Sequence, residues 1–239
     1  NDLDNLSWIA NFASKIGAHS TSVLALEKII QLDSQRTSVY LQLGRVQLAD
    51  GNEEKAKDTF TRLCDLENPS PHELVQAGEE LLNLGHILQA IDCLERSAQI
   101  CEVNEIEDAL LPKIWSKLAT CYQHENEDKK ALKVLDKAIT IQLENPLWRI
   151  QKSDVLHKMG RYQAALASLN HALEFSPEDP HLHYKASILY KKAGDKESAL
   201  QHAIKADQGY KTLGSDYELN RYHALVLSGT LAWGLLKLR

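Results

Sequence analysis

Small and apolar residues recur along the chain at a nearly constant interval. When the repeating segments are aligned, one turn residue falls in each of six copies: Gly17, Gly51, Gly85, Asn126, Gly160 and Gly194. Successive members are 34, 34, 41, 34 and 34 residues apart. Glycine, with asparagine as its usual substitute, accepts the left-handed conformation that ends many helices. The column therefore predicts a turn between two helices in every copy.

Three further columns describe how the two helices of a copy meet. Seven residues before the turn stand the small residues Ala10, Gly44, Gly78, Ala119, Ser153 and Ser187, and five after it stand Ser22, Ala56, Ala90, Ala131, Ala165 and Ala199. Nine after the turn stand Leu26, Phe60, Leu94, Leu135, Leu169 and Ala203. Small residues let helices approach closely while larger ones fill the surrounding space. We therefore expect pairs of antiparallel helices and no strands.

The pattern resembles the tetratricopeptide repeat, a 34-residue helix-turn-helix unit with a Leu-Gly pair, a Tyr, an Ala, a Phe and a closing Pro at set places. Leu43 and Gly44 form the Leu-Gly pair, Ala56 and Phe60 match the Ala and the Phe, and residues 112–145 nearly reproduce the whole pattern. The resemblance covers about residues 3–211. It implies an all-α fold, a right-handed α-solenoid of antiparallel helix pairs, the TPR superhelix.

The repeat column divides the chain into consecutive units. We place the repeats at about 3–36, 37–70, 71–111, 112–145, 146–179 and 180–214, and we expect residues 1–239 to form a single TPR solenoid because neighbouring pairs bury their faces on each other. The seven extra residues in the third interval predict a longer second helix or a longer loop after it. Residues 215–239 then form a terminal helix, which is either a cap or the first helix of a seventh repeat.

Composition narrows the class of protein. The chain is 44% hydrophobic and 25% charged, which is typical of an ordered globular protein. Its net charge of −6 hides an asymmetry, because residues 1–110 carry 19 acidic against 8 basic residues and the remainder carries 14 against 19. No stretch approaches the roughly 18 apolar residues of a membrane span, and no secretory signal is visible. These features favour a cytoplasmic location, with the nucleus possible, and the absence of an initiator methionine suggests a trimmed chain or a piece of a longer one.

Candidate chemistry is sparse. No phosphate-binding, nucleophile-elbow or zinc motif occurs, so we expect no catalysis, no cofactor and no metal. The four cysteines show no CxxC spacing and are interpreted as reduced core thiols. His181 and His183 are two residues apart and so lie on different sides of a helix; we interpret the histidines of this region as surface or groove residues. The acidic net charge makes nucleic-acid binding unlikely.

In the resembled family the first helices of the pairs line a concave face that holds a partner peptide. Counting back from the turn column places eleven candidate groove residues there: Asn11, Arg45, Glu79, Gln123, His124, Asp154, His157, Lys158, Tyr184, Lys191 and Lys192. The basic members in the later repeats favour an acidic or amphipathic segment.

Family members that bind a chaperone tail grip its carboxylate with a Lys and two Asn residues. Asn11 matches one of these places, but Ser7 stands where the Lys is required and Gln42 where the second Asn is required. The incomplete clamp argues against a chaperone tail as the ligand.

The terminal helix carries more apolar side chains than a free end normally shows. We expect Leu227, Leu231, Trp233 and Leu235 to form an interface with a second copy or with an adjoining chain. Together the patterns predict a non-catalytic protein–protein interaction scaffold that binds a peptide or helical segment of another protein. Two alternatives stay open, namely a self-assembly or structural module and a regulatory sensor array within a larger multidomain protein.

Overall fold

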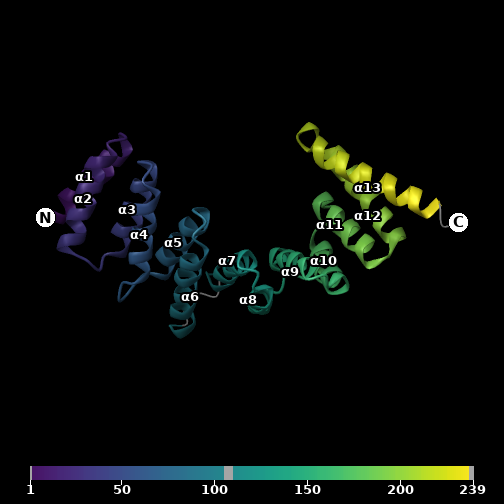
Figure 1. Cartoon of the computed structure of the whole chain (residues 1–239), viewed down its shortest axis with the longest axis horizontal. Coiled ribbons are helices and arrows are strands. Elements are labelled where there is room, and N and C mark those ends of the chain that lie inside the picture. The colour runs from purple at the N-terminus through teal and green to yellow at the C-terminus, as the bar shows by residue number, and fades with distance from the viewer. Residues whose placement is uncertain (1, 105–109, 237–239) are drawn as a thin grey trace. The chain divides into compact units, whose positions relative to one another are not determined.

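The computed structural model describes residues 2–104 and 110–236, with the side chains of Ser215 and of residues 233–236 left out, and these residues form helices without any strand (Figure 1). One short 3-10 helix, η1 (Ser215–Tyr217), precedes the last α-helix. The α-helices are α1 (Asp2–Lys15), α2 (His19–Leu32), α3 (Thr37–Ala49), α4 (Glu53–Cys64), α5 (Pro71–Asn83), α6 (Ile87–Val103), α7 (Leu110–His124), α8 (Asp128–Ile141), α9 (Pro146–Lys158), α10 (Tyr162–Phe175), α11 (Pro180–Ala193), α12 (Lys196–Leu213) and α13 (Glu218–Leu236).

Each predicted repeat holds two of these helices, which confirms the all-α fold of antiparallel helix pairs. The chain divides into two compact units, residues 1–127 and 128–239. In the first unit each helix packs on the next, and in addition α3 contacts α5, α5 contacts α7 and α4 contacts α6. In the second unit α8 to α13 also pack in sequence. The single solenoid over residues 1–239 stays a prediction.

The turn column has the backbone conformation that the sequence predicts. Its glycines have φ between +72° and +91°, and Asn126 has φ +59°. The N–H that follows each turn residue returns to a carbonyl five residues earlier, as from Ala18 to Ala13 at 2.8 Å and from Arg161 to Leu156 at 2.9 Å. This left-handed closure satisfies carbonyls at the end of the first helix and redirects the chain into the second.

The small columns mark the crossing of the two helices. A methyl group added to Gly44 would overlap the ring of Phe60, and one added to Gly78 would lie 2.9 Å from Cγ of Leu94. In the first pair the hydroxyl of Ser22 donates to the carbonyl of Ala10 at 2.9 Å. The two helices of a pair are therefore as close as their side chains permit.

The extra residues of the third repeat lengthen its second helix. α6 has 17 residues, whereas α2 has 14 and α4 has 12. Its additional turn buries Cys101. Residues 105–109, which hold the rest of the insertion, lie outside the described residues.

The prediction of four reduced thiols is wrong for two of them. Cys64 at the end of α4 and Cys93 in α6 form a disulfide, with their Cα atoms 5.4 Å apart. The two residues are 29 positions apart and lie on consecutive second helices, so only the stacking of the repeats brings them together. Cys101 and Cys121 are free and buried, as expected.

The terminal helix α13 packs on α12 of its own chain. Leu231 is 3% exposed and lies against Ala199 and Ala203, with Leu227 beside them. The prediction that Leu231 is available to another chain is therefore wrong, because this side of α13 completes the core of the second unit. Trp233 and Leu235 fall outside the described side chains. None of the described helices combines the length and the apolar character needed to cross a bilayer.

A histidine pair lies in the second unit. His183 is 4% exposed, its Nε2 is 2.8 Å from the carbonyl of Pro177, and its Nδ1 is 3.0 Å from Nδ1 of His202. The interpretation of this region's histidines as surface or groove residues is thus wrong for His183, which packs between α11 and α12. Burial lowers the pKa of both imidazoles, that of His202 to about 4, and the nearby Lys205 adds to the effect.

The crossing predicts opposite effects for two glycine substitutions. Gly44→Ala should lower the free energy of unfolding by about 1–3 kcal/mol, because the clash with Phe60 outweighs the gain in helix propensity. Gly229→Ala, in α13 with nothing within 4 Å of the new methyl, should raise it by about 0.5–1 kcal/mol. Urea unfolding followed by circular dichroism measures both changes. A Gly44→Ala variant as stable as the parent would show that the helices do not cross closely.

The histidine pair predicts acid sensitivity. The folded-state pKa of His202 lies below its unfolded value, so the unfolded chain binds the extra proton; the contribution is complete above about pH 6.5 and is lost as the pH falls toward 4. The carboxylates of Glu178 and Asp179 raise the pKa of His183, but burial has the larger effect and the pKa stays lowered. Urea midpoints between pH 7.5 and 4.5 should therefore fall less steeply in His202→Gln than in the exposed control His124→Gln. Parallel curves for the two variants would contradict this.

Candidate functional site

A cavity of about 410 Å³ lies between α1 and α3, the first helices of the first two pairs. α1 contributes Asn11 and Ser14, and α3 contributes residues spaced three or four apart along one side. The lining consists of Asn11, Ser14, Ser38, Leu41, Gln42, Arg45, Val46 and Ala49. Two residues predicted for the groove, Asn11 and Arg45, therefore lie at one cavity.

Two amide side chains span this cavity. Nε2 of Gln42 donates to Oδ1 of Asn11 at 2.6 Å; Asn11 is exposed and Gln42 is half-buried. Each amide has both a donor and an acceptor end, so the pair presents both kinds of group to a ligand. Leu41 and Val46 beneath them are almost completely buried and provide apolar surface. The cavity thus combines an amide pair with an apolar floor.

Ion pairs connect the first helices of neighbouring pairs. Nε of Arg45 is 3.0 Å from Oε1 of Glu80, and in the same unit Nζ of Lys117 is 2.5 Å from Oε1 of Glu79. Exposed pairs of this kind contribute about 0.2–1 kcal/mol each. Arg45 and Glu79, both predicted as peptide contacts, therefore also hold adjacent repeats in register.

The second unit shows the same arrangement. Nζ of Lys185 on α11 lies 2.6 Å from both carboxylate oxygens of Asp154 on α9. Nζ of Lys158 lies 3.2 Å from Asp128. Asp154 and Lys158 therefore have partners within the fold.

The remaining predicted groove residues are dispersed. His157 is half-buried with its ring 5.9 Å from that of Tyr162, and Tyr184 packs against the cluster that α12 and α13 form around Tyr210. Lys192 lines a different cavity, near the turn before α10. Gln123 is half-buried, whereas His124 and Lys191 are exposed. Within the first unit Asn11 and Arg45 therefore share one cavity, and within the second unit Lys192 lies at another.

Sequence reasoning overlooked part of the cavity. Ser14 and Ser38 were not predicted, although small polar residues on a solvent-facing side are what leaves the space between α1 and α3 unfilled. In the sequence Gln42 was identified only as a mismatch to the chaperone clamp. Its hydrogen bond to Asn11 makes it part of the site. The partners Glu80, Lys117 and Lys185 were missed because a single helix pattern does not show which residues face each other across repeats.

Comparison with known protein families identifies the repeat. Residues 38–66 and 112–145 match models described as tetratricopeptide repeat, and residues 154–194 match one described as TPR repeat. These matches fall on the second, fourth and fifth predicted repeats, the last extending into the sixth.

Curated relatives share the repeat at low identity. The chain is 24% identical over 211 residues to a TPR repeat-containing protein of Methanocaldococcus jannaschii, covering 82% of this chain and 36% of the relative. It is 26% identical over 202 residues to anaphase-promoting complex subunit 3 of Schizosaccharomyces pombe, covering 82% and 29%. DnaJ homolog subfamily C member 3 of Homo sapiens is 24% identical over 206 residues, covering 85% and 36%. The chain spans about a third of the length of these relatives.

Solved structures show the same fold. YrrB, described as a TPR protein with an unusual peptide-binding site, superposes with a TM-score of 0.59 at 19% identity, covering 77% of this chain and 92% of YrrB. The C-terminal part of a TPR repeat-containing protein from Cytophaga hutchinsonii superposes with a TM-score of 0.66 at 12% identity, covering 93% and 91%. The turn residue in six repeats, the paired helices and these matches identify the repeats of this chain as tetratricopeptide repeats.

Proposed function

We propose that this chain is a non-catalytic protein–protein interaction scaffold that binds a peptide segment of a partner on the first helices of its repeats. The observation that carries the proposal is the Asn11–Gln42 amide pair above the apolar floor of the cavity between α1 and α3. A peptide backbone carries one donor and one acceptor per residue, and the two amides offer both complements. Leu41 and Val46 accept an apolar side chain of the same segment.

The charges around the cavity favour an internal segment over a free C-terminus. Arg45 lies beside Glu80, so its charge is largely balanced, and no lysine replaces the one missing at Ser7. A terminal carboxylate would therefore find weak compensation. The description of YrrB as a peptide-binding TPR protein supports the proposal by likeness of fold.

The other predicted groove residues enter the proposal as secondary contacts. Exposed His124 in the first unit and exposed Lys191 in the second are each accessible to a ligand bound to their own unit, and the basic residues of the second unit favour acidic positions in a ligand bound there. The cytoplasmic or nuclear location expected from the sequence belongs to the proposal as well. It conflicts with the structure in one respect, because a disulfide such as Cys64–Cys93 is rare in reducing compartments.

Panning a random heptapeptide phage library on the immobilised chain tests the peptide site. Enriched peptides should lose about tenfold in affinity for the double variant Asn11→Ala with Gln42→Ala, because both backbone partners disappear. Gln31→Ala, which removes an exposed amide from α2, is the matched control and should change affinity less than about twofold. Peptides that bind the double variant as well as the parent, or a library without enrichment, would contradict the proposal.

A second candidate function, self-association or contact with an adjoining chain through α13, is favoured by one observation. On the side of α13 that faces away from α12, Leu219, Tyr222, Leu225 and Val226 are 44–65% exposed. Exposed apolar groups of this kind are common at protein contacts.

Light scattering tests self-association. If α13 joins two copies, the parent chain should show a mass that rises with concentration, and Tyr222→Ser with Val226→Ser should keep the monomer mass at every concentration. Leu24→Ser, an exposed apolar change on α2, is the control and should behave like the parent. A monomeric parent at high concentration would exclude self-association through this face.

A further inference from the structure

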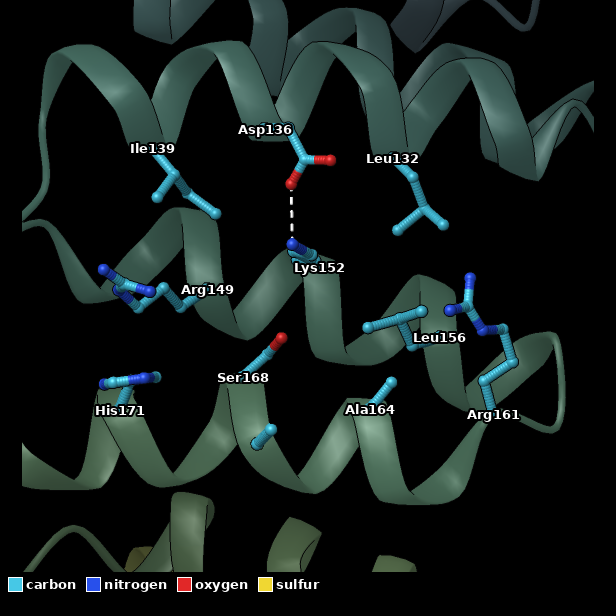
Figure 2. A pocket seen from close by; sticks show the side chains of 11 residues that line it. Leu132, Asp136, Ile139, Arg149, Lys152, Leu156, Arg161, Ala164, Ser168 and His171 are labelled. Atoms are coloured by element: carbon cyan, nitrogen blue, oxygen red, sulfur yellow. Dashed lines mark hydrogen bonds and ion pairs between the residues drawn. The ribbon is translucent and has the colours of Figure 1, made fainter.

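A second cavity lies within the second unit, residues 128–239. It has a volume of about 450 Å³ and is bounded by α8 and α10, the second helices of consecutive pairs, with α9 between them (Figure 2). On α9 its lining residues Arg149, Lys152 and Leu156 point away from Asp154, which pairs with α11. The cavity is therefore independent of the first-helix face.

Helix periodicity places the lining residues together. α8 contributes Leu132, Asp136 and Ile139 at intervals of four and three, and α10 contributes a small-residue side. The α10 residues are Ala164, Ala167, Ser168 and His171. Because alanine and serine stand where other second helices could carry larger groups, the space between α8 and α10 is left open.

The cavity is positively charged at both ends. Figure 2 shows Arg149 and His171 toward one end and Arg161 toward the other, with Leu156 and Ala164 between them. Its one carboxylate, Asp136, is already bound to Lys152 at 2.6 Å. The charges of Arg149 and Arg161 therefore remain for a ligand.

The two arginines have little compensation in the fold. Nη2 of Arg149 donates to the carbonyl of Leu143 at 3.3 Å, while its buried Nε has no hydrogen-bond partner. Across the described part of the chain, no carboxylate forms an ion pair with Arg149 or Arg161. A guanidinium group without a carboxylate partner is incompletely compensated, and a ligand carboxylate would supply the missing charge.

The basic surface continues past the turn. A neighbouring cavity of about 490 Å³ shares Arg161 and Ala164 with the first and adds Tyr162 and Lys192. Residues 128–239 as a whole hold 17 Lys and Arg against 12 Asp and Glu. The surroundings therefore attract a negatively charged ligand to this side.

We propose that the cavity between α8 and α10 binds an acidic segment of a partner protein, with carboxylates at both ends and apolar residues in the middle. The planar guanidinium groups of Arg149 and Arg161 can each donate two parallel hydrogen bonds to one carboxylate. Leu132, Leu156 and Ala164 form the apolar surface between them. A single strand of nucleic acid fits less well, because its bases need aromatic stacking platforms along a basic groove.

Fluorescence anisotropy with a labelled synthetic peptide, fluorescein-Glu-Glu-Leu-Leu-Glu-Glu, tests the proposal on the full chain. Arg149→Gln with Arg161→Gln should weaken binding about tenfold. Lys196→Gln with Lys211→Gln changes the net charge equally at exposed positions of α12 and should weaken it less than about twofold. Equal losses in the two variants would overturn the proposal in favour of unspecific charge attraction.

A variant without charge change keeps the test decisive if the arginine variant fails to fold. Ala167 is exposed at the cavity, so Ala167→Trp should fill the space and also weaken the probe about tenfold. Asn11→Ala with Gln42→Ala should leave the probe affinity unchanged, which separates this site from the proposed groove. Unchanged binding to Ala167→Trp would overturn the proposal.

The probe itself supplies the remaining controls. Replacing its glutamates by glutamine should abolish binding, and replacing its leucines by serine should weaken it. A serine probe that binds as tightly as the original would indicate a site for anions alone, and displacement of the original probe by oligo-dT at equal concentration would indicate a nucleic-acid site. Either result would overturn the assignment to an acidic protein segment.

Discussion

The close crossing of a small residue on one helix over a large one on the next is the contact on which the rest of the fold depends. Gly44 leaves no room for a methyl group beneath Phe60, and Gly78 leaves little beneath Leu94. A helix pair alone exposes too much apolar surface to be stable, so it must stack on its neighbours. The crossing sets the angle at which each pair presents its outer faces, and the left-handed turn residue connects the two helices at that angle.

The two outer faces that result differ in chemistry. On the first helices, polar pairs such as Arg45–Glu80 and Asp154–Lys185 bridge adjacent repeats and leave the Asn11–Gln42 amides as the polar groups over a cavity. In the second unit, the small residues of α10 leave a hollow that is also lined by Arg149 of α9 and by Arg161, which have no ion-pair partner among the described residues. One repeat architecture therefore supplies a nearly neutral cavity, for which we propose a peptide backbone as ligand, and a basic cavity, for which we propose an acidic segment.

Features that depend on residues close together in the sequence could be predicted, whereas features that depend on contacts between distant segments could not. The turn column and the presence of two helices in each repeat depend on backbone preferences within one repeat, so a 34-residue period was sufficient to predict them. The Cys64–Cys93 bond depends on which residues stacking brings opposite each other, and the burial of His183 depends on its contact with His202 on the other helix of the same pair. Leu231 was misassigned for the same reason, since the pattern of α13 shows an apolar side but not that α12 covers it.

Only some residues of the candidate site could be predicted from the sequence. Asn11 and Arg45 were found because the family pattern fixes the inward positions of a first helix. Ser14 and Ser38 were not, because a cavity arises where two helices both carry small residues, and this depends on their register. The arginines of the second cavity were not predicted, because the family pattern fixes only the inward positions of the first helices and this cavity lies on another side of α9.

A double-mutant cycle between Gly44 and Phe60 tests the crossing most directly. Ala10 and Leu26 occupy the equivalent positions in the first pair and pack in one cluster, so alanine is compatible with leucine at this crossing. If the Phe60 ring excludes the methyl group, Gly44→Ala destabilises the parent but costs little or nothing in a Phe60→Leu background. An equal loss of unfolding free energy in both backgrounds would show that the cost of the methyl group does not come from the Phe60 ring, and would contradict the crossing as the basis of the fold.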